Sequence, residues 1–208
     1  MIPVRAGRST RPFQALRQFA RRGPVEYCNL CNVRLEPGHV HVIDPANRRI
    51  LCACQACSVV FGDTYKRIPR RVRLLEHFEL TDNQWNNLAV PINMAFFFHS
   101  TVGDQVIGLY PSPAGAIESA MPPDKWREIA KNNPVLSGME PDVEALLVNR
   151  LGPAKGHDGP GYYMLPIDEC FRLVGLVRTY WRGLSGGTEV WREIGQFFSE
   201  MKERSCRA

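Results

Sequence analysis

The spacing of the cysteines constrains this chain more than any other feature of its sequence. Five of the seven cysteines lie within residues 28–57, and four of them form two C-x2-C pairs, Cys28 with Cys31 and Cys54 with Cys57. Structural zinc sites take four tetrahedral Cys or His ligands, and two such pairs are a typical way to supply them. Between the pairs, residues 39–43 and 49–52 are strand-like and residues 44–47 favour a turn. The pattern predicts a zinc-ribbon-like module, in which two knuckles on a β-hairpin hold one ion.

Other ligands and other metals remain open at this point. Cys52 is a surplus thiol that can compete for the ion or pack beneath it, and His39 and His41 are further alternates because mixed Cys and His sites also occur. Zinc is the expected metal, but the same four thiolates hold a single iron in rubredoxins. An iron–sulfur cluster that uses Cys52 is a third interpretation.

The charge distribution divides the chain into two parts. Residues 1–73 carry 14 Lys or Arg and 4 Asp or Glu, a net charge of +10, whereas residues 74–208 carry 12 and 17, a net charge of −5. Residues 1–24 contain six arginines and no acid, with an apolar stripe at helical spacing. We therefore predict a basic amphipathic arm at 1–24, the zinc-ribbon-like module at 25–73 and an α+β body at 74–208.

The body alternates strand-like and helix-like segments, and two helices end it. Acids open the segment from Pro166 and arginines close it, as the helix dipole favours, and a second amphipathic helix begins at Thr188. A short capped helix is expected at 81–85, strands at 90–99, 106–110 and 162–165, and a helix at 124–132. Pro141 and Gly152 predict one more helix, over 141–152. The predicted fold class is α+β, with a mixed body that finishes in a helical pair.

Catalytic residues are not apparent from spacing. Glu118 lies in the segment 111–119, whose two prolines and Gly115 predict a loop, and loops often carry function. Asp168 and Glu169 are adjacent, so on a helix their side chains diverge by about 100° and do not form a facing acid/base pair. The known nucleophile, phosphate-binding and metalloprotease motifs are absent. The sequence therefore favours a protein that is not an enzyme, with an enzyme acting through 111–119 as a remaining alternative.

The surroundings of the protein follow from composition. No apolar run approaches the ~20 residues that a membrane span requires, and the free thiols suit the reducing cytoplasm. The arginines of the first part can attract nucleic acid. This partner is disfavoured, because the region lacks an aromatic strand on which bases would stack. An acidic protein surface, including that of the protein's own second part, accounts for the arginines equally well.

Several strings together resemble a known family. They are CNLC, LCACQAC, YPSPAGAIES, NPVL, PDVEALLVNR, YYMLPIDECFRLVGLVR and WRGLSGG, in this order between about residues 27 and 198. They are similar to an uncharacterised bacterial family, a domain of unknown function often encoded beside nickel–iron hydrogenase genes. The resemblance implies a cytoplasmic protein that serves a hydrogenase system as an assembly factor, adaptor or electron-transfer accessory. It also suggests a partner surface around the segments 111–119, 142–150 and 168–182, with Glu118, Asp168, Glu169, Arg178 and Arg182 as its charged residues.

These observations lead to one expectation and several alternatives. We expect a non-enzymatic metal-binding accessory protein with a structural zinc and a protein partner. The resemblance implies that hydrogenase components are that partner. A rubredoxin-like iron protein is the alternative, and an enzyme or a nucleic-acid binder are further ones.

Overall fold

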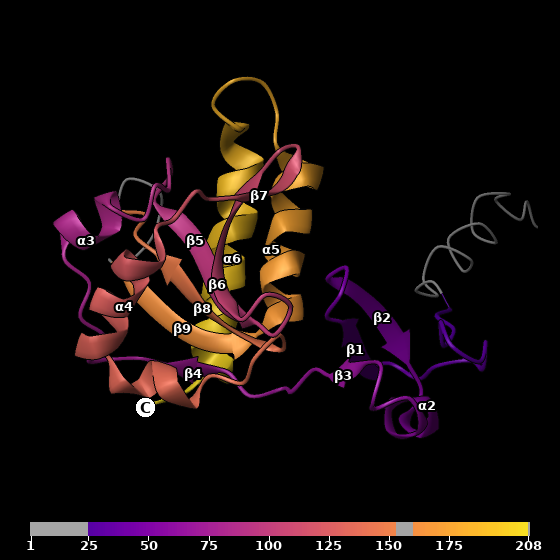
Figure 1. The fold of residues 1–208 in the computed structure, drawn as a ribbon. Helices are drawn as coiled ribbons and strands as arrows, with labels where there is room; N and C mark the ends of the chain where they lie inside the picture. The colour runs from indigo at the N-terminus through magenta and orange to yellow at the C-terminus, as the bar shows by residue number, and fades with distance from the viewer. Residues whose placement is uncertain (1–24, 153–159, 208) are drawn as a thin grey trace, which may run out of the picture.

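A computed structural model describes residues 25–152 and 160–207 of the chain. The basic arm predicted at 1–24 lies outside the described residues. The rest of the chain forms a small N-terminal module and a larger body (Figure 1). The mixed α+β class is confirmed, and both parts are built on predominantly antiparallel sheets.

The module contains a three-stranded sheet of order β2-β1-β3 and a short helix. Its elements are β1 (Val40–Asp44), β2 (Arg49–Ala53), α2 (Gln55–Val60) and β3 (Lys66–Arg67). The predicted hairpin is confirmed, because β1 pairs with β2 in antiparallel register. Asp44 closes the turn by accepting hydrogen bonds from the amide of Ala46 at 3.0 Å and the side chain of Asn47 at 2.8 Å.

The body is organised around a seven-stranded sheet of order β10-β4-β9-β8-β5-β6-β7. All its neighbouring strands are antiparallel except β10 and β4, which are parallel. The strands are β4 (Arg73–Leu74), β5 (Met94–Ser100), β6 (Gln105–Ser112), β7 (Gly115–Glu118), β8 (Glu144–Asn149), β9 (Gly161–Pro166) and β10 (Cys206–Arg207).

Helices cover both faces of this sheet (Figure 1). One face carries α5 (Ile167–Tyr180) and α6 (Gly187–Arg204), which pack side by side as the predicted helical pair. The other face carries α3 (Asp82–Asn86), α4 (Pro123–Asn132) and the 3-10 turn η1 (Pro134–Gly138). The expected cap of α3 is present as a capping box between Thr81 and Gln84. Every helix among the described residues is too short or too polar to span a lipid bilayer.

The central strands are buried on both sides because their apolar residues run without interruption. In β5, Phe96 and Phe98 face the core beneath α5 and α6, whereas Phe97 faces the core beneath α3 and α4. Alternate residues of a strand point to opposite faces, so a continuous apolar run fills both cores.

The helix predicted over 141–152 is wrong, because these residues contain β8, which lies between β5 and β9. All six residues of β8 are buried, and its central apolar run, residues 145–148, carries no periodicity to separate helix from strand. Its burial also removes the segment 142–150 as an exposed partner surface, since residues 142–149 are buried.

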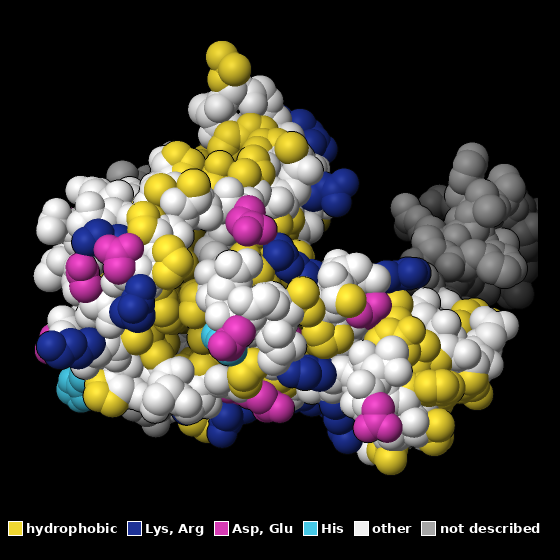
Figure 2. Space-filling model, in the orientation of Figure 1, with side chains coloured by type: hydrophobic (Ala, Val, Ile, Leu, Met, Phe, Trp, Pro, Cys, Tyr) yellow, Lys and Arg dark blue, Asp and Glu magenta, His cyan; other side chains and the backbone are white. Residues whose placement is uncertain are grey.

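The module packs against the body through apolar and charged side chains. Ile43 of β1 and Ile68, which follows β3, are buried and belong to the core beneath α5 and α6. Figure 2 shows Lys and Arg side chains gathered where the module meets the body. The two parts are therefore in direct contact.

Candidate metal centre

The two C-x2-C pairs converge on one point. The sulfurs of Cys28, Cys31, Cys54 and Cys57 all lie within 4.8 Å of one another. None of them forms a disulfide. Zinc–sulfur bonds of about 2.3 Å place the sulfurs of a tetrahedral site about 3.8 Å apart, and Cys31 Sγ lies 3.8 Å from Cys54 Sγ. This tetra-cysteine group has the composition and spacing to hold a metal ion.

The first pair sits in a tight turn. The amide of Cys28 donates to the carbonyl of Val33 at 2.8 Å, and the amide of Asn32 donates to the carbonyl of Cys28 at 2.8 Å. Asn32 has a φ of 60°, in the left-handed region that asparagine tolerates better than most residues. The chain can therefore reverse directly after Cys31 and keep both sulfurs on one side.

The second pair lies at the start of a helix and not in a turn. Cys54 is the N-cap of α2, and its Sγ accepts a hydrogen bond from the amide of Cys57 at 3.4 Å. Ser58, which directly follows Cys57, lies inside α2 and donates its hydroxyl to the carbonyl of Gln55 at 2.9 Å. The sequence did not reveal this helix, because α2 is only six residues long.

One residue that the sequence analysis did not single out joins the two pairs. The amide of Asn29 donates to the carbonyl of Cys52 at 2.8 Å, and Asn29 Oδ1 accepts from the amide of Cys52 at 2.7 Å. Asn29 therefore ties the first turn to the end of β2, directly before the second pair. An asparagine between two cysteines of a C-x2-C pair was the only signal for this role.

The environment differentiates the four thiols. Burial alone would raise the pKa of Cys28, but hydrogen bonds from the amides of Cys54, Leu30 and Cys31 outweigh it and lower the pKa to about 6. Burial and neighbouring sulfurs raise the pKa of Cys57 to about 12. Metals bind the thiolate form of cysteine. The low pKa of Cys28 already favours its thiolate, whereas a bound cation would drive the deprotonation of Cys57.

The three alternate ligands form a separate group. His39, His41 and Cys52 each place one ligand atom within 4.8 Å of the other two, and this group shares no member with the tetra-cysteine group. Cys52 pairs directly with His41 across the β1–β2 hairpin.

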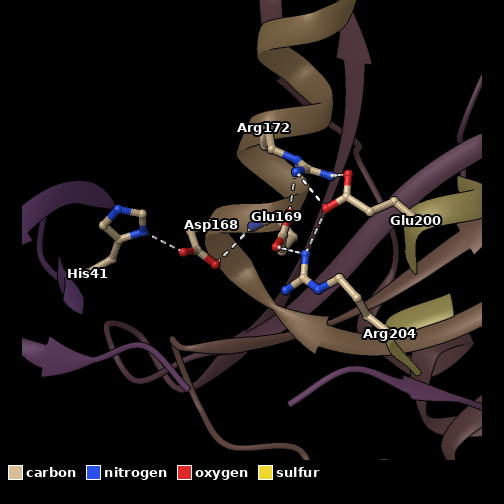
Figure 3. A network of polar contacts seen from close by, with 6 residues as sticks. All are labelled: His41, Asp168, Glu169, Arg172, Glu200 and Arg204. Carbon is tan, nitrogen blue, oxygen red and sulfur yellow. Dashed lines mark hydrogen bonds and ion pairs between the residues drawn. The ribbon is translucent and has the colours of Figure 1, made fainter. Parts of the chain in front are cut away.

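Three of the five residues predicted for a partner surface form ion pairs within the chain. Asp168 Oδ2 lies 2.6 Å from His41 Nδ1, and this hydrogen bond is the main reason why the pKa of His41 is raised. Glu169 points away from Asp168, toward Arg172 at 3.0 Å and Arg204 at 2.6 Å (Figure 3). The predicted divergence of the two acids is thus confirmed.

The other charged residues of that surface differ in their surroundings. Glu118 pairs with Arg48 of the module at 3.0 Å. The guanidinium of Arg182 donates to the carbonyls of Thr179 and Trp181, both at 2.9 Å. Arg178 is exposed on the last turn of α5. The partner surface itself remains a prediction.

The segment 111–119, expected to be a loop, is mostly the β6–β7 hairpin. Its hydroxyls are used locally, because Ser112 Oγ accepts from the amide of Ala114 at 3.1 Å and the buried Ser119 donates to the carbonyl of Leu88 at 2.5 Å. Its one acid, Glu118, pairs with Arg48. The two serines and the one acid of this segment, on which an enzyme acting through 111–119 would depend, thus all form contacts within the chain.

Lys and Arg side chains within the range 25–73 also form ion pairs with acidic side chains of the body. Lys66 Nζ lies 2.7 Å from Asp142 Oδ2, and Arg71 and Arg73 lie 3.0 Å and 3.7 Å from the buried carboxylate of Glu144. The protein's own acidic part therefore accounts for several of the cations that would otherwise suggest a nucleic-acid surface.

Comparison with known proteins places the chain in a family without assigning an activity. Neither the curated proteins nor the solved structures gave a match. A family model matches residues 27–205, a range that includes the tetra-cysteine group and nearly all of the module and the body. The chain belongs to the family of unknown function DUF5947.

Proposed function

We propose that this protein is a non-enzymatic metal-binding accessory protein whose four cysteines hold a structural zinc. The observation that carries the proposal is the convergence of Cys28, Cys31, Cys54 and Cys57 within 4.8 Å. Their placement on a turn and on a helix start at the two ends of the β1–β2 hairpin suits a zinc-ribbon-like staple, in which the metal fastens these two ends together.

The module needs such a staple because its own core is small. Its buried apolar cluster consists mainly of Leu35, Val40, Val42, Leu51 and Ala53, together with two of the cysteines. Binding of structural zinc contributes folding free energy directly, on the order of 10–16 kcal/mol in zinc-finger peptides. We expect the module to lose its structure when the metal is removed.

We further propose that the protein serves a nickel–iron hydrogenase system in the bacterial cytoplasm, as an assembly or adaptor factor. The resemblance described above supports this role. The module also exposes large apolar side chains, namely Val25, Tyr27, Val33, Val59, Val60 and Phe61. Figure 2 shows hydrophobic side chains on the outer side of the module. Exposed apolar patches often mark protein interfaces, so this part of the module suits a protein partner.

A rubredoxin-like iron site is the second candidate, and the exposure of Cys31 favours it. An exposed thiolate ligand brings the metal close to solvent, where an electron can pass to a partner. Protein purified from its native host decides between the two metals. Colourless protein with zinc in elemental analysis supports the structural site, whereas red protein with iron supports electron transfer.

The partner proposal is tested by affinity purification from the native host. We expect hydrogenase subunits to co-purify with the wild type and to be lost with Val60→Glu, which places a charge on α2. Val102→Glu is the matched control, because Val102 is also exposed but lies in the body. Recovery of no hydrogenase component with the wild type would contradict the accessory role.

A further inference from the structure

His39, His41 and Cys52 come together on one face of the hairpin. His39 directly precedes β1, and His41 is two residues further along it, so their side chains share a face. Cys52 is the residue directly opposite His41 on β2. The two imidazole rings meet edge to face with centroids 5.0 Å apart, and the three ligand atoms lie within 4.8 Å of one another.

The ring of His39 has a buried nitrogen without a partner. Its side chain is only 8 % exposed. Nδ1 lies 3.2 Å from the carbonyl oxygen of Glu36, which can only accept, so in the neutral imidazole Nδ1 carries the proton and Nε2 has the lone pair. Among the described residues, Nε2 of His39 is buried with no hydrogen-bond partner. Buried polar atoms normally have a hydrogen-bond partner. His39 instead belongs to a group of three residues whose side chains are of types that bind metal ions.

The ring of His41 is oriented in the same way. Its Nδ1 lies 2.6 Å from Asp168 Oδ2 at the start of α5, and Asp168 Oδ1 accepts from the amide of Glu169 at 2.9 Å (Figure 3). A carboxylate on one ring nitrogen is the usual support of a metal-ligating histidine, because it fixes the ring and leaves the other nitrogen for the ion. Both histidines thus have an acceptor on Nδ1, an orientation that directs Nε2 as the nitrogen for an ion, and within residues 25–152 and 160–207 the buried Nε2 of His39 lacks a hydrogen-bond partner.

We propose that His39, His41 and Cys52 form a second metal site, which binds a zinc-class divalent ion through two imidazole nitrogens and one thiolate. The site goes beyond the proposed function, since it shares no ligand with the structural centre. Three protein ligands leave a tetrahedral ion one position for water or another exchangeable ligand, which is the pattern of reactive rather than structural zinc sites. Asp168 connects this site to the body and acts as its positioning residue.

Cobalt titration of the chelator-treated, reduced full chain tests the proposal. We expect wild type to bind two equivalents, one with sulfur ligands alone and one with imidazole and a single sulfur. His39→Ala and Cys52→Ser are expected to bind one equivalent and to keep the sulfur-only spectrum. His77→Ala is the control, because His77 is exposed in the body and its loss is expected to leave both equivalents.

The positioning role of Asp168 has its own pair of variants. Loss of a carboxylate behind a metal-ligating histidine typically lowers metal affinity 10–100-fold. We expect Asp168→Ala to show this loss at the second site alone. Glu169→Ala removes the neighbouring acid, which pairs with Arg172 and Arg204, and is expected to leave metal affinity unchanged.

X-ray absorption of the wild type loaded with two equivalents gives an answer even if a variant fails to fold. Imidazole scattering that appears with the second equivalent supports the site. Binding of one equivalent only, or a second equivalent without nitrogen ligands, would overturn it. Neither result would contradict the structural site of four cysteines. That site would be contradicted if no equivalent of metal showed sulfur ligands alone.

Discussion

Asn29 and Cys52 exchange two hydrogen bonds, one through the backbone at 2.8 Å and one through the side chain of Asn29 at 2.7 Å. This pair sets the position of one cysteine pair relative to the other. Asn29→Ala leaves the amide of Cys52 without its acceptor, and such a loss typically costs about 1–3 kcal/mol when the group stays buried. We expect weaker metal binding in chelator competition and a lower midpoint of thermal unfolding.

The matched control for this variant is Asn86→Ala, because Asn86 is exposed on α3 in the body. We expect it to change metal affinity little. Equal effects of the two substitutions would show that the Asn29 contact does not organise the cysteines.

Gly108 of β6 lies opposite Phe97 of β5, and a Cβ at this position would come within 2.8 Å of the Phe97 ring. The ring is fully buried and packs against Trp126 at a centroid distance of 5.5 Å, so it cannot move aside freely. We expect Gly108→Ala to lower the free energy of unfolding by about 1–3 kcal/mol, as overpacking does. Chemical denaturation provides the measurement.

Gly175 on α5 is the control for this steric argument. A Cβ there meets nothing within 4 Å. Alanine in an exposed helix is more favourable than glycine by about 0.8–1.0 kcal/mol. We therefore expect Gly175→Ala to stabilise the protein, and an equal loss in both variants would refute the specific clash at Phe97.

Glu144 is a fully buried carboxylate that holds the chain joining the module to the body. Arg71 and Arg73 lie at 3.0 Å and 3.7 Å, and the amide of Glu140 donates to it at 3.0 Å. Only the carboxylate of this pair is fully buried, since Arg71 is 57% exposed, so the loss is closer to that of a hydrogen bond to a charged group, about 1.5–3 kcal/mol. We expect Glu144→Gln to lower the free energy of unfolding by that order, as measured by denaturant titration.

Glu118→Gln is the comparison for Glu144, because the pair between Glu118 and Arg48 is substantially exposed. Exposed pairs contribute about 0–1 kcal/mol. If Glu118→Gln lowered the free energy of unfolding as much as Glu144→Gln, burial of the carboxylate would not be the reason for the effect at Glu144.

Asp142 gives the protein a pH dependence in the acid range. Burial would raise the pKa of Asp142, but the Lys66 ammonium and the hydroxyl and amide of Thr101 outweigh burial and lower the pKa. Its contribution to stability is therefore present above the unfolded-state pKa of about 3.9 and is lost as the pH falls through the lower folded-state value.

We expect the stability difference between wild type and Asp142→Asn to shrink as the pH falls below about 4. Acid also releases metal from both proteins, so the difference between them, measured by thermal unfolding at each pH, is the informative quantity. A difference that stays constant down to pH values well below about 3 would contradict the lowered pKa.

The features that sequence patterns predicted are local ones. The four cysteines, the turn at Asp44, the capping box at Thr81 and the amphipathic faces of α5 and α6 each follow from residues close together in the chain. Such patterns reflect the backbone and burial preferences of neighbouring residues. The structure confirms these local features.

The features that sequence patterns did not predict depend on distant partners. β8 was taken for a helix because its burial comes from β5 and β9 on either side. The contact of His41 with Asp168 joins residues 127 positions apart, and no short motif encodes it. The start of α2 at Cys54 was missed because a helix of fewer than two turns carries too little periodicity.

In the proposed function, Cys28, Cys31, Cys54 and Cys57 coordinate one ion. Zinc-edge X-ray absorption of the full chain, reconstituted with a single equivalent of zinc under reducing conditions, tests it most directly. We expect four sulfur neighbours at about 2.3 Å. A first shell dominated by nitrogen and oxygen, or an ion that is lost on gel filtration, would contradict it.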